Sequence, residues 1–163
     1  MIEKILISTG GSGGHVVPAT ILHEHLKDQF DVFVTTDVRG MKFLDKKKYN
    51  LKVFNVPQIS KNILLIPFQF FLIIYLIVKL IFFLKKKNID VLISTGGYMS
   101  LPFCVASRFL NIKLFLFEPN MVLGRSNKFF IRFCENIFCY SNKIKNFPNK
   151  YISKINVIPA LLR

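Results

Sequence analysis

A glycine-rich run near the amino terminus has residue types suited to binding a phosphate group. Ser12, Gly13 and Gly14 lie between an apolar run and a segment with helical character. Backbone amides without side chains can approach an anion closely, and the amino terminus of a helix adds a favourable dipole. The run lacks the G-K-[ST] ending of a P-loop, and no acidic residue closes a second strand where a dinucleotide fingerprint requires one. It therefore predicts an anion site of another kind.

His15 follows directly after this run, where a neutral imidazole could take a proton from a substrate hydroxyl. Histidine serves as a general base because it changes charge near neutral pH. A histidine in this position can also simply cap the helix. The sequence leaves both interpretations open.

A second glycine turn, Gly96 and Gly97, follows another apolar run and leads into Tyr98. The carboxyl ends of parallel strands meet at one edge of a sheet, so two glycine turns in equivalent positions predict one two-sided anion site. Glu118 and Asn120 follow a third apolar run and precede Gly124-Arg125-Ser126-Asn127-Lys128, which places carboxylate, amide and cationic groups at the same rim. Taken alone, Asn120 is more typical of a turn than of a ligand site.

The elements that must position these residues alternate between short apolar runs and longer helical stretches. Strands are expected at 4–9, 31–36, 51–56, 90–95, 113–118, 136–140 and 154–158. Helices are expected at 16–27, 39–48, 63–87, 101–110 and 124–133, of which the second is short and lysine-rich enough to be partly loop. Such alternation is typical of parallel α/β sheets, and no linker or composition break divides the chain. We therefore expect one domain over 1–163, an α/β, Rossmann-like parallel sheet with helices on both faces.

The composition of the 163 residues limits the possible classes of protein. Hydrophobic residues make up 52% and phenylalanine occupies 18 positions, which excludes a disordered tail. The 23 Lys and Arg far exceed the 9 Asp and Glu, and the net charge of +14 favours anionic partners: headgroups, nucleic acid or phosphorylated substrates. A coding sequence rich in A and T would also enrich Lys, Asn, Ile and Phe without any such partner.

The three cysteines, Cys104, Cys134 and Cys139, are odd in number and show no C-x-x-C spacing. This pattern predicts neither a disulfide framework nor a zinc site, and we expect reduced core residues. The amino terminus carries an acidic residue and leads straight into an apolar run, which is not the pattern of a signal peptide. We therefore expect a cytoplasmic chain.

The 63–84 segment is almost entirely apolar and is followed by three lysines. At about 1.5 Å rise per residue it could cross a hydrocarbon core of about 30 Å. A crossing would place the loops of one doubly wound crevice on opposite sides of the membrane, so we favour a crossover helix that lies in the membrane interface. A true span and a wholly buried core helix are the alternatives. The expected membrane contacts are Phe68, Phe71, Leu72, Tyr75, Lys79, Lys85, Lys86 and Lys87.

Three stretches of the chain, taken together, resemble the amino-terminal domain of MurG-type glycosyltransferases of family 28. They are Gly10-Gly11-Ser12-Gly13-Gly14-His15 with Pro18-Ala19, Gly96-Gly97-Tyr98-x-Ser100-x-Pro102, and Glu118-x-Asn120-x-x-x-Gly124-x-x-Asn127-Lys128. The resemblance covers essentially the whole chain and implies the amino-terminal half of a GT-B fold. It also implies an inverting transfer of N-acetylglucosamine from UDP-N-acetylglucosamine to the polyprenyl-diphospho-linked sugar lipid I in peptidoglycan synthesis, without a metal or other cofactor.

The resemblance also implies roles for individual positions. The catalytic residues would be His15, as the base, with Tyr98 and Asn120. The nucleotide sugar or the acceptor diphosphate would contact Ser12, Gly13, Gly14, Gly96, Gly97, Glu118, Asn127 and Arg163. The family usually has H-E-Q-N where this chain has Phe117-Glu118-Pro119-Asn120, and the Gly-Asn pair expected before Arg163 is missing.

The family has a second α/β domain, about as long again, that carries most of the donor contacts. We therefore expect this chain to bind acceptor and membrane peripherally, at the cytoplasmic face of the bacterial inner membrane. It would transfer sugar only with a donor domain, from a continuation of the chain or from a separate polypeptide. A second hypothesis is a non-catalytic membrane anchor that recruits a catalytic partner. Nucleic-acid binding is not expected, because the lysines are scattered and no reader motif accompanies them.

Overall fold

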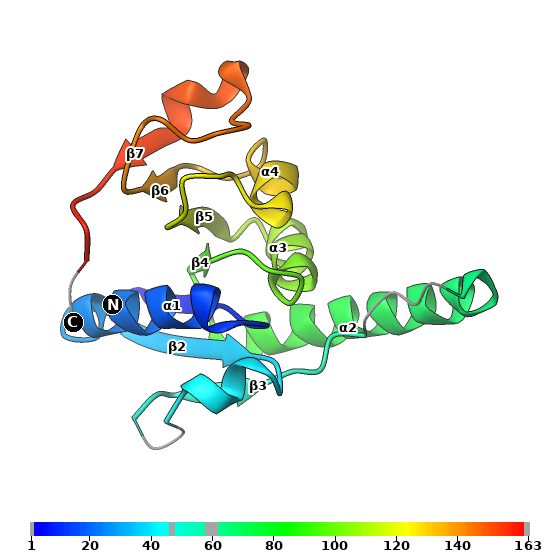
Figure 1. The fold of residues 1–163 in the computed structure, drawn as a ribbon. Coiled ribbons are helices and arrows are strands. Elements are labelled where there is room, and N and C mark those ends of the chain that lie inside the picture. The colour runs from blue at the N-terminus through cyan, green and yellow to red at the C-terminus, as the bar shows by residue number, and fades with distance from the viewer. Residues whose placement is uncertain (1, 46–47, 58–61, 162–163) are drawn as a thin grey trace.

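The computed structural model describes residues 2–45, 48–57 and 62–161 and places seven parallel strands in one sheet (Figure 1). The strands are β1 (Lys4–Ser8), β2 (Asp31–Thr36), β3 (Leu51–Val53), β4 (Val91–Ser94), β5 (Lys113–Glu118), β6 (Ile137–Cys139) and β7 (Ile155–Val157). Their order is β3-β2-β1-β4-β5-β6-β7, so the chain moves outward in one direction from β1 and in the other from β4. The loops after β1 and β4 therefore separate at the centre of the sheet, which is the usual place for a binding crevice in such folds.

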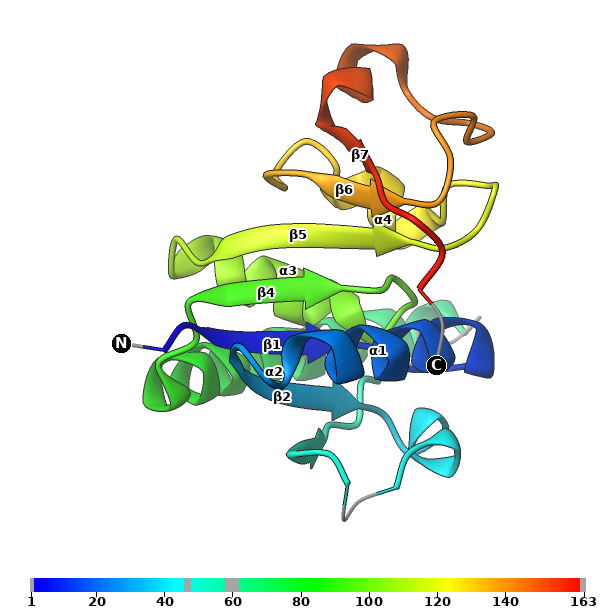
Figure 2. The ribbon, with the colours of Figure 1, turned by 90° about the vertical axis from the view of Figure 1, so that its left-hand side faces the viewer.

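Helices cover both faces of the sheet, as the sequence predicts (Figure 2). The helix α1 (Gly13–Leu26) lies on one face, and α2 (Ile66–Lys87), α3 (Ser100–Phe109) and α4 (Arg125–Phe130) lie on the other. Short 3-10 turns are formed by η1 (Gly40–Phe43), η2 (Ile63–Leu65) and η3 (Asn149–Lys154). A strand covered on both faces is expected to be apolar throughout, and every residue of β4 is buried.

The larger core lies between the sheet and the three helices of the second face. The predicted core cysteines, Cys104, Cys134 and Cys139, are buried there as free thiols. Burial raises the pKa of Cys104 and Cys139 to about 12 and that of Cys134 to about 11. These thiols therefore stay protonated in the folded chain, and their burial confirms that they are core residues.

The face that carries α1 is covered less completely. The chain after β7 runs back across this face (Figure 2), where Ile158 and Leu161 pack against the same core as α1. Between this segment and α1 an apolar hollow of about 420 Å³ stays open, with Ile93 and Phe117 of the sheet in its lining. The two faces of the sheet thus differ in how fully they are covered.

The helix α2 is the crossover between β3 and β4, and its two halves have different surroundings. Leu76, Leu80 and Leu84 are buried in the core, whereas the residues of the helix before Leu76 are exposed or half-buried. In Figure 1 the first half extends beyond the sheet. Because so few of its residues are buried, the interpretation as a wholly buried core helix is wrong.

The predicted membrane contacts on α2 are all exposed: Phe68, Phe71, Leu72, Tyr75, Lys79, Lys85, Lys86 and Lys87. Within the described part of the chain, α2 is the one helix whose length and apolar composition would allow it to cross a membrane. Its second half packs on the sheet, so that half cannot be surrounded by lipid.

Two expected helix positions are corrected by the structure. The helix expected at 39–48 is wrong, because the chain forms only the 3-10 turn η1 there, and residues 46–47 lie outside the described residues. Gly40 is a poor helix former, and the turn ends at Leu44, whose backbone is extended and whose side chain is buried. The helix α1 begins at Gly13 rather than at residue 16, because Ser12 is extended and already takes the N-cap position.

Candidate functional site

The loops after β1 and β4 lie side by side at the carboxyl edge of the sheet. Thr95 Oγ1 donates a hydrogen bond of 2.8 Å to Thr9 Oγ1. A Cβ atom on Gly97 would lie 3.2 Å from the carbonyl oxygen of Gly10. Gly96 and Gly97 also have φ angles of 86° and 82°, which side-chain-bearing residues rarely adopt. The two glycine turns meet as the sequence predicts, and the second turn requires glycine for both space and conformation.

His15 joins the two loops through its side chain. It lies in the first turn of α1, and its Nδ1 is 2.8 Å from the carbonyl oxygen of Thr95 in the other loop. A carbonyl can only accept, so Nδ1 carries the hydrogen and the neutral ring keeps an unprotonated Nε2. Ser12 holds the N-cap position and the ring bonds another strand's loop, so the helix-cap interpretation of His15 is wrong.

A buried aspartate supports the first loop. Asp37 follows β2, and its Oδ1 accepts hydrogen bonds from the N–H groups of Gly11 (2.9 Å) and Gly40 (2.8 Å). Its Oδ2 pairs with the Arg39 guanidinium at 2.9 Å. Burial acts to raise the pKa of Asp37, but the two backbone hydrogen bonds and Arg39 outweigh it and hold the pKa below its usual value. The carboxylate is thus fully used in shaping the loop.

A buried glutamate supports the opposite rim. Glu118 ends β5, and its carboxylate accepts from the Gly124 N–H at 2.8 Å and from Nδ2 of both Asn120 and Asn127 at 3.0 Å. Glu118 and Asn127 are buried, whereas Asn120 is exposed. The three predicted site residues therefore form one network, in which burial of Glu118 and Asn127 favours a supporting role over direct contact with substrate.

The other predicted residues occupy different places around the two loops. Ser12 and Gly14 are exposed at the mouth, and Gly13 is half-buried. Tyr98 lines the cleft described below, but its hydroxyl donates to the Pro57 carbonyl oxygen at 2.6 Å and so ties the loop to the segment before α2. Arg163 lies outside the described residues. Within the described ranges, no three His, Cys, Asp or Glu side chains form a group that could hold a metal ion.

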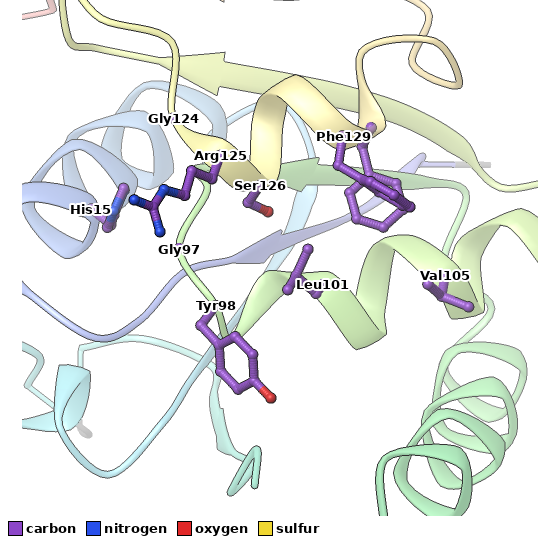
Figure 3. A pocket seen from close by; sticks show the side chains of 10 residues that line it. His15, Gly97, Tyr98, Leu101, Val105, Gly124, Arg125, Ser126 and Phe129 are labelled. Atoms are coloured by element: carbon purple, nitrogen blue, oxygen red, sulfur yellow. The ribbon is translucent and has the colours of Figure 1, made fainter. Parts of the chain in front are cut away.

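A cleft of about 760 Å³ opens between these loops and the helices α3 and α4 (Figure 3). One end is polar and the other is apolar. The lining residues are His15, Gly97, Tyr98, Leu101, Val105, Gly124, Arg125, Ser126, Phe129 and Phe130.

Arg125 belongs to the 124–128 segment whose cationic groups the sequence places at the rim, but the sequence does not single it out as a site residue. Its exposed side chain reaches from α4 toward His15 across the polar end of the cleft (Figure 3). In the part of the chain that the structure describes, Arg125 forms no ion pair, although several other cations do. The sequence places two cations of this segment, Arg125 and Lys128, at the rim, and the fold shows that Arg125 lines the cleft.

Comparisons with known proteins agree with this architecture. The family model of the glycosyltransferase family 28 N-terminal domain matches residues 5–139. The chain is 68% identical over 163 residues to the UDP-N-acetylglucosamine--N-acetylmuramyl-(pentapeptide) pyrophosphoryl-undecaprenol N-acetylglucosamine transferase of Pelagibacter ubique, covering 100% of the chain and 46% of that protein. It is 35% identical to the transferase of the same name from Rickettsia typhi, covering 99% of the chain and 42% of that protein.

The crystal structure of Acinetobacter baumannii MurG has the same fold, with a TM-score of 0.80 at 22% identity over 99% of this chain and 46% of that one. The chain thus spans less than half the length of these relatives. The fold and the resemblance expected from the sequence motifs are both confirmed. The chain belongs to glycosyltransferase family 28, whose N-terminal domain it contains.

Proposed function

We propose that this chain forms the acceptor-side half of an enzyme that transfers N-acetylglucosamine from UDP-N-acetylglucosamine to a sugar carried on a polyprenyl diphosphate. The names of its relatives describe transfer of N-acetylglucosamine to such a lipid-linked acceptor. The observation that carries the proposal is the position of His15, whose ring bridges the two glycine loops and lines the cleft.

In the proposed reaction His15 is the general base. The bond from Nδ1 to the Thr95 carbonyl fixes the ring and leaves Nε2 as the proton acceptor. Nε2 takes the proton of the acceptor hydroxyl while its oxygen attacks C1 of the donor sugar. The bond from C1 to the diphosphate breaks, UDP leaves with that electron pair, and the configuration at C1 is inverted. Such proton transfer contributes about 10²-fold to 10⁴-fold to a rate.

The test uses a chimera in which this chain is joined to the remaining part of the Pelagibacter ubique relative. His15→Ala should lower kcat for transfer to a lipid I analogue by about 10²-fold or more. His25→Ala is the matched control, because His25 is exposed on the same helix and does not line the cleft, and it should leave kcat unchanged. An unchanged kcat in His15→Ala would show that His15 is not the general base, and an inactive parent chimera would favour the alternative role of an anchor for a catalytic partner.

We also propose that the donor half is required for turnover. The cleft is bordered here by only one family domain, and the relatives are more than twice as long as this chain. The 163-residue chain incubated with UDP-N-acetylglucosamine and a lipid I analogue should therefore transfer no sugar, and measurable product would contradict this requirement.

A membrane-facing role for α2 is the second part of the proposal. At about 100° per residue, Phe68, Phe71, Tyr75 and Phe82 fall on one side of the helix, and each is more than 60% exposed. Burying one such ring in lipid is worth about 1.5–3 kcal/mol, and each nearby lysine adds about 1 kcal/mol at an anionic surface. We expect the chain to lie peripherally on the cytoplasmic face of the inner membrane, with α2 along the surface.

Vesicle sedimentation tests this placement. The chain should sediment with vesicles of phosphatidylcholine and phosphatidylglycerol, less so at high salt, and should not be retained on DNA under the same conditions. Phe71→Asp with Tyr75→Asp should abolish sedimentation, whereas Ile152→Asp, an exposed apolar position on η3, should not change it. Equal loss in all variants, or binding to DNA alone, would contradict the membrane role.

A further inference from the structure

Two buried threonines precede the glycine turns. Thr9 follows β1 and Thr95 follows β4, and neither residue is exposed to solvent. Their hydroxyl groups join the two loops, because Thr95 Oγ1 donates to Thr9 Oγ1 at 2.8 Å. A buried hydroxyl is costly unless it is hydrogen-bonded, and an apolar side chain could fill either place without that cost. Packing alone therefore does not explain why this pair is polar.

The His15 ring belongs to one of these loops but is held by the other. Its helix, α1, follows the first glycine turn, whereas the carbonyl oxygen that accepts the hydrogen of Nδ1 is that of Thr95, after β4. The ring also lies against the second turn (Figure 3). A Cβ atom on Gly96 would be 3.5 Å from Cε1, and one on Gly97 would be 3.4 Å from Cδ2. The position of the ring therefore depends on how far apart the two loops lie.

The hydroxyl pair holds the two loops closer together than apolar side chains would. The oxygens of an O–H···O bond lie about 2.7–2.8 Å apart, whereas two carbon atoms in contact prefer about 3.5–4.0 Å. Thr9→Val combined with Thr95→Val would thus move the loops roughly 1 Å apart. The contact from His15 Nδ1 to the Thr95 carbonyl oxygen, now 2.8 Å, would then be too long for a hydrogen bond.

That contact decides which nitrogen of the ring can act as a base. A neutral histidine carries one ring hydrogen, and the hydrogen bond that one nitrogen makes fixes the tautomer. We propose that Thr9 and Thr95 are positioning residues for His15, whose hydroxyl pair holds the Thr95 carbonyl where it keeps the hydrogen on Nδ1. The proposal rests on the proposed function and adds to it, because two hydroxyl groups that do not line the cleft set the proton-accepting form of the base.

Nitrogen-15 NMR of the histidine rings in the 163-residue chain tests the proposal without any need for turnover. In mildly alkaline buffer, where histidine is neutral, the ring shifts show which nitrogen carries the hydrogen. The signals of His15 are those that His15→Ala removes. Thr9→Val with Thr95→Val should raise the ratio of the Nε2–H form to the Nδ1–H form about tenfold, the equivalent of one ordinary hydrogen bond. An unchanged ratio would overturn the proposal.

The double variant is the main test because it should stay folded. Replacing both partners of a hydrogen bond by apolar groups of the same shape is nearly neutral in stability, whereas either single change leaves the other hydroxyl buried without its partner. Thr95→Ser keeps the hydroxyl and should keep the parent ratio. A ratio in Thr95→Ser like that of the double variant would show that the hydroxyl does not hold the ring.

Thr20→Val is the matched control on the same helix as His15. It removes the hydroxyl of another buried threonine, which donates to the Val17 carbonyl oxygen at 2.8 Å within α1. The tautomer ratio of His15 should therefore stay at the parent value. A change as large as that in the double variant would indicate a general loosening of the fold and would overturn the positioning role.

Kinetics of the chimera connect the ring to the reaction. A misplacement of about 1 Å at a catalytic group can cost about 10²-fold in rate. Thr9→Val with Thr95→Val should therefore lower kcat about tenfold or more and leave the KM for the lipid I analogue unchanged, because no group that lines the cleft is removed. Thr20→Val should leave both constants unchanged. A higher KM at constant kcat in the double variant would contradict the proposal.

Failure of the proposal can be separated from failure of the proposed function. If the parent chimera transfers sugar and His15→Ala lowers kcat, but the double variant keeps the parent ratio and kcat, the positioning role is wrong and the transferase role stands. If the parent chimera transfers no sugar while the NMR gives the expected ratios, the transferase role fails and the hydroxyl pair still sets the tautomer of His15.

Discussion

The two sides of the cleft are each built around a buried carboxylate, but the two carboxylates are stabilised differently. Asp37 is 6% exposed and Glu118 is 1% exposed. Asp37 combines two backbone N–H groups with the Arg39 guanidinium. Glu118 accepts only from the neutral groups of Asn120, Gly124 and Asn127, and within the described chain it has no cationic partner.

This difference determines on which side of the cleft a positively charged side chain remains available to a ligand. On the first side the Arg39 guanidinium is paired with the Asp37 carboxylate. On the second side the neutral dipoles stabilise Glu118, and Arg125, which follows Gly124 directly, turns into the cleft. A buried carboxylate held by dipoles alone therefore leaves the neighbouring cation available to substrate. The comparison predicts that the second side depends more strongly on its carboxylate than the first.

The largest expected effect is the loss of Glu118. Glu118→Ala should lower the free energy of unfolding by about 3 kcal/mol or more, because the Gly124 N–H and Asn127 Nδ2 lose their acceptor and a large buried side chain leaves a cavity. Asp37→Ala should have a smaller effect, because Arg39 can return to water. Urea unfolding followed by far-UV circular dichroism measures both. The reverse order would refute the comparison.

Gly97→Ala should produce the next largest effect. The alanine would have to adopt a positive φ and would press on the Gly10 carbonyl and the His15 ring, which together cost about 1–3 kcal/mol. Gly14→Ala is the matched change on the first side, since its nearest neighbour is Ser12 Oγ at 3.7 Å. The same urea titration should place Gly14→Ala at or above the parent stability. Equal destabilisation by both changes would show that the second turn is no tighter than the first.

Acidification should weaken the first side through Asp37. Folding lowers the pKa of this carboxyl from its usual 3.8, so its ionised form stabilises the fold. That contribution is fully present above about pH 3.8 and is lost as the pH falls through the lower value of the folded state. The difference in urea midpoint between the parent chain and Asp37→Asn should therefore shrink at acidic pH. A difference that stays constant with pH would separate the role of Asp37 from its charge.

The smallest effect should come from Arg39. Its side chain is 52% exposed, and exposed ion pairs contribute about 0–1 kcal/mol. Arg39→Gln should therefore lower the urea midpoint only slightly, and the loss should shrink further in high salt. A loss as large as that of Asp37→Ala would mean that the ion pair, rather than the backbone amides, holds the first side together.

The sheet and the two glycine turns could be predicted from the sequence because their signals are local. Apolar runs of strand length end in Gly10 and Gly96, and the parallel arrangement brings all strand ends to one edge. The bond from His15 to Thr95 joins residues 80 positions apart, so no local pattern reports it. The helix expected at 39–48 failed for a related reason, because Leu44 is extended and packs in a cluster with Val16 and Val34, and no local pattern reports these contacts.

The sequence predicted the members of the network around Glu118 but not their roles. Its members were predicted to touch substrate, whereas burial places Glu118 and Asn127 behind the rim. Arg125 could not be singled out among so many cations, because charge alone does not tell which side chain faces a cleft. In each case the sequence could not show how deeply a polar group is buried, that is, which group lies at the surface and which lies beneath it.

The labelling rates of the three protonated thiols can report how the core opens. A thiol reacts with iodoacetamide only as an exposed thiolate, so Cys104, Cys134 and Cys139 should label only in molecules that have opened. Cys104 lies in α3 and Cys139 in β6, so their labelling rates report on different parts of the same core. A mass spectrum that passes directly from unlabelled to triply labelled chains would mean that the core opens all at once. Singly labelled chains carrying only Cys139 would mean that the β6 edge opens first.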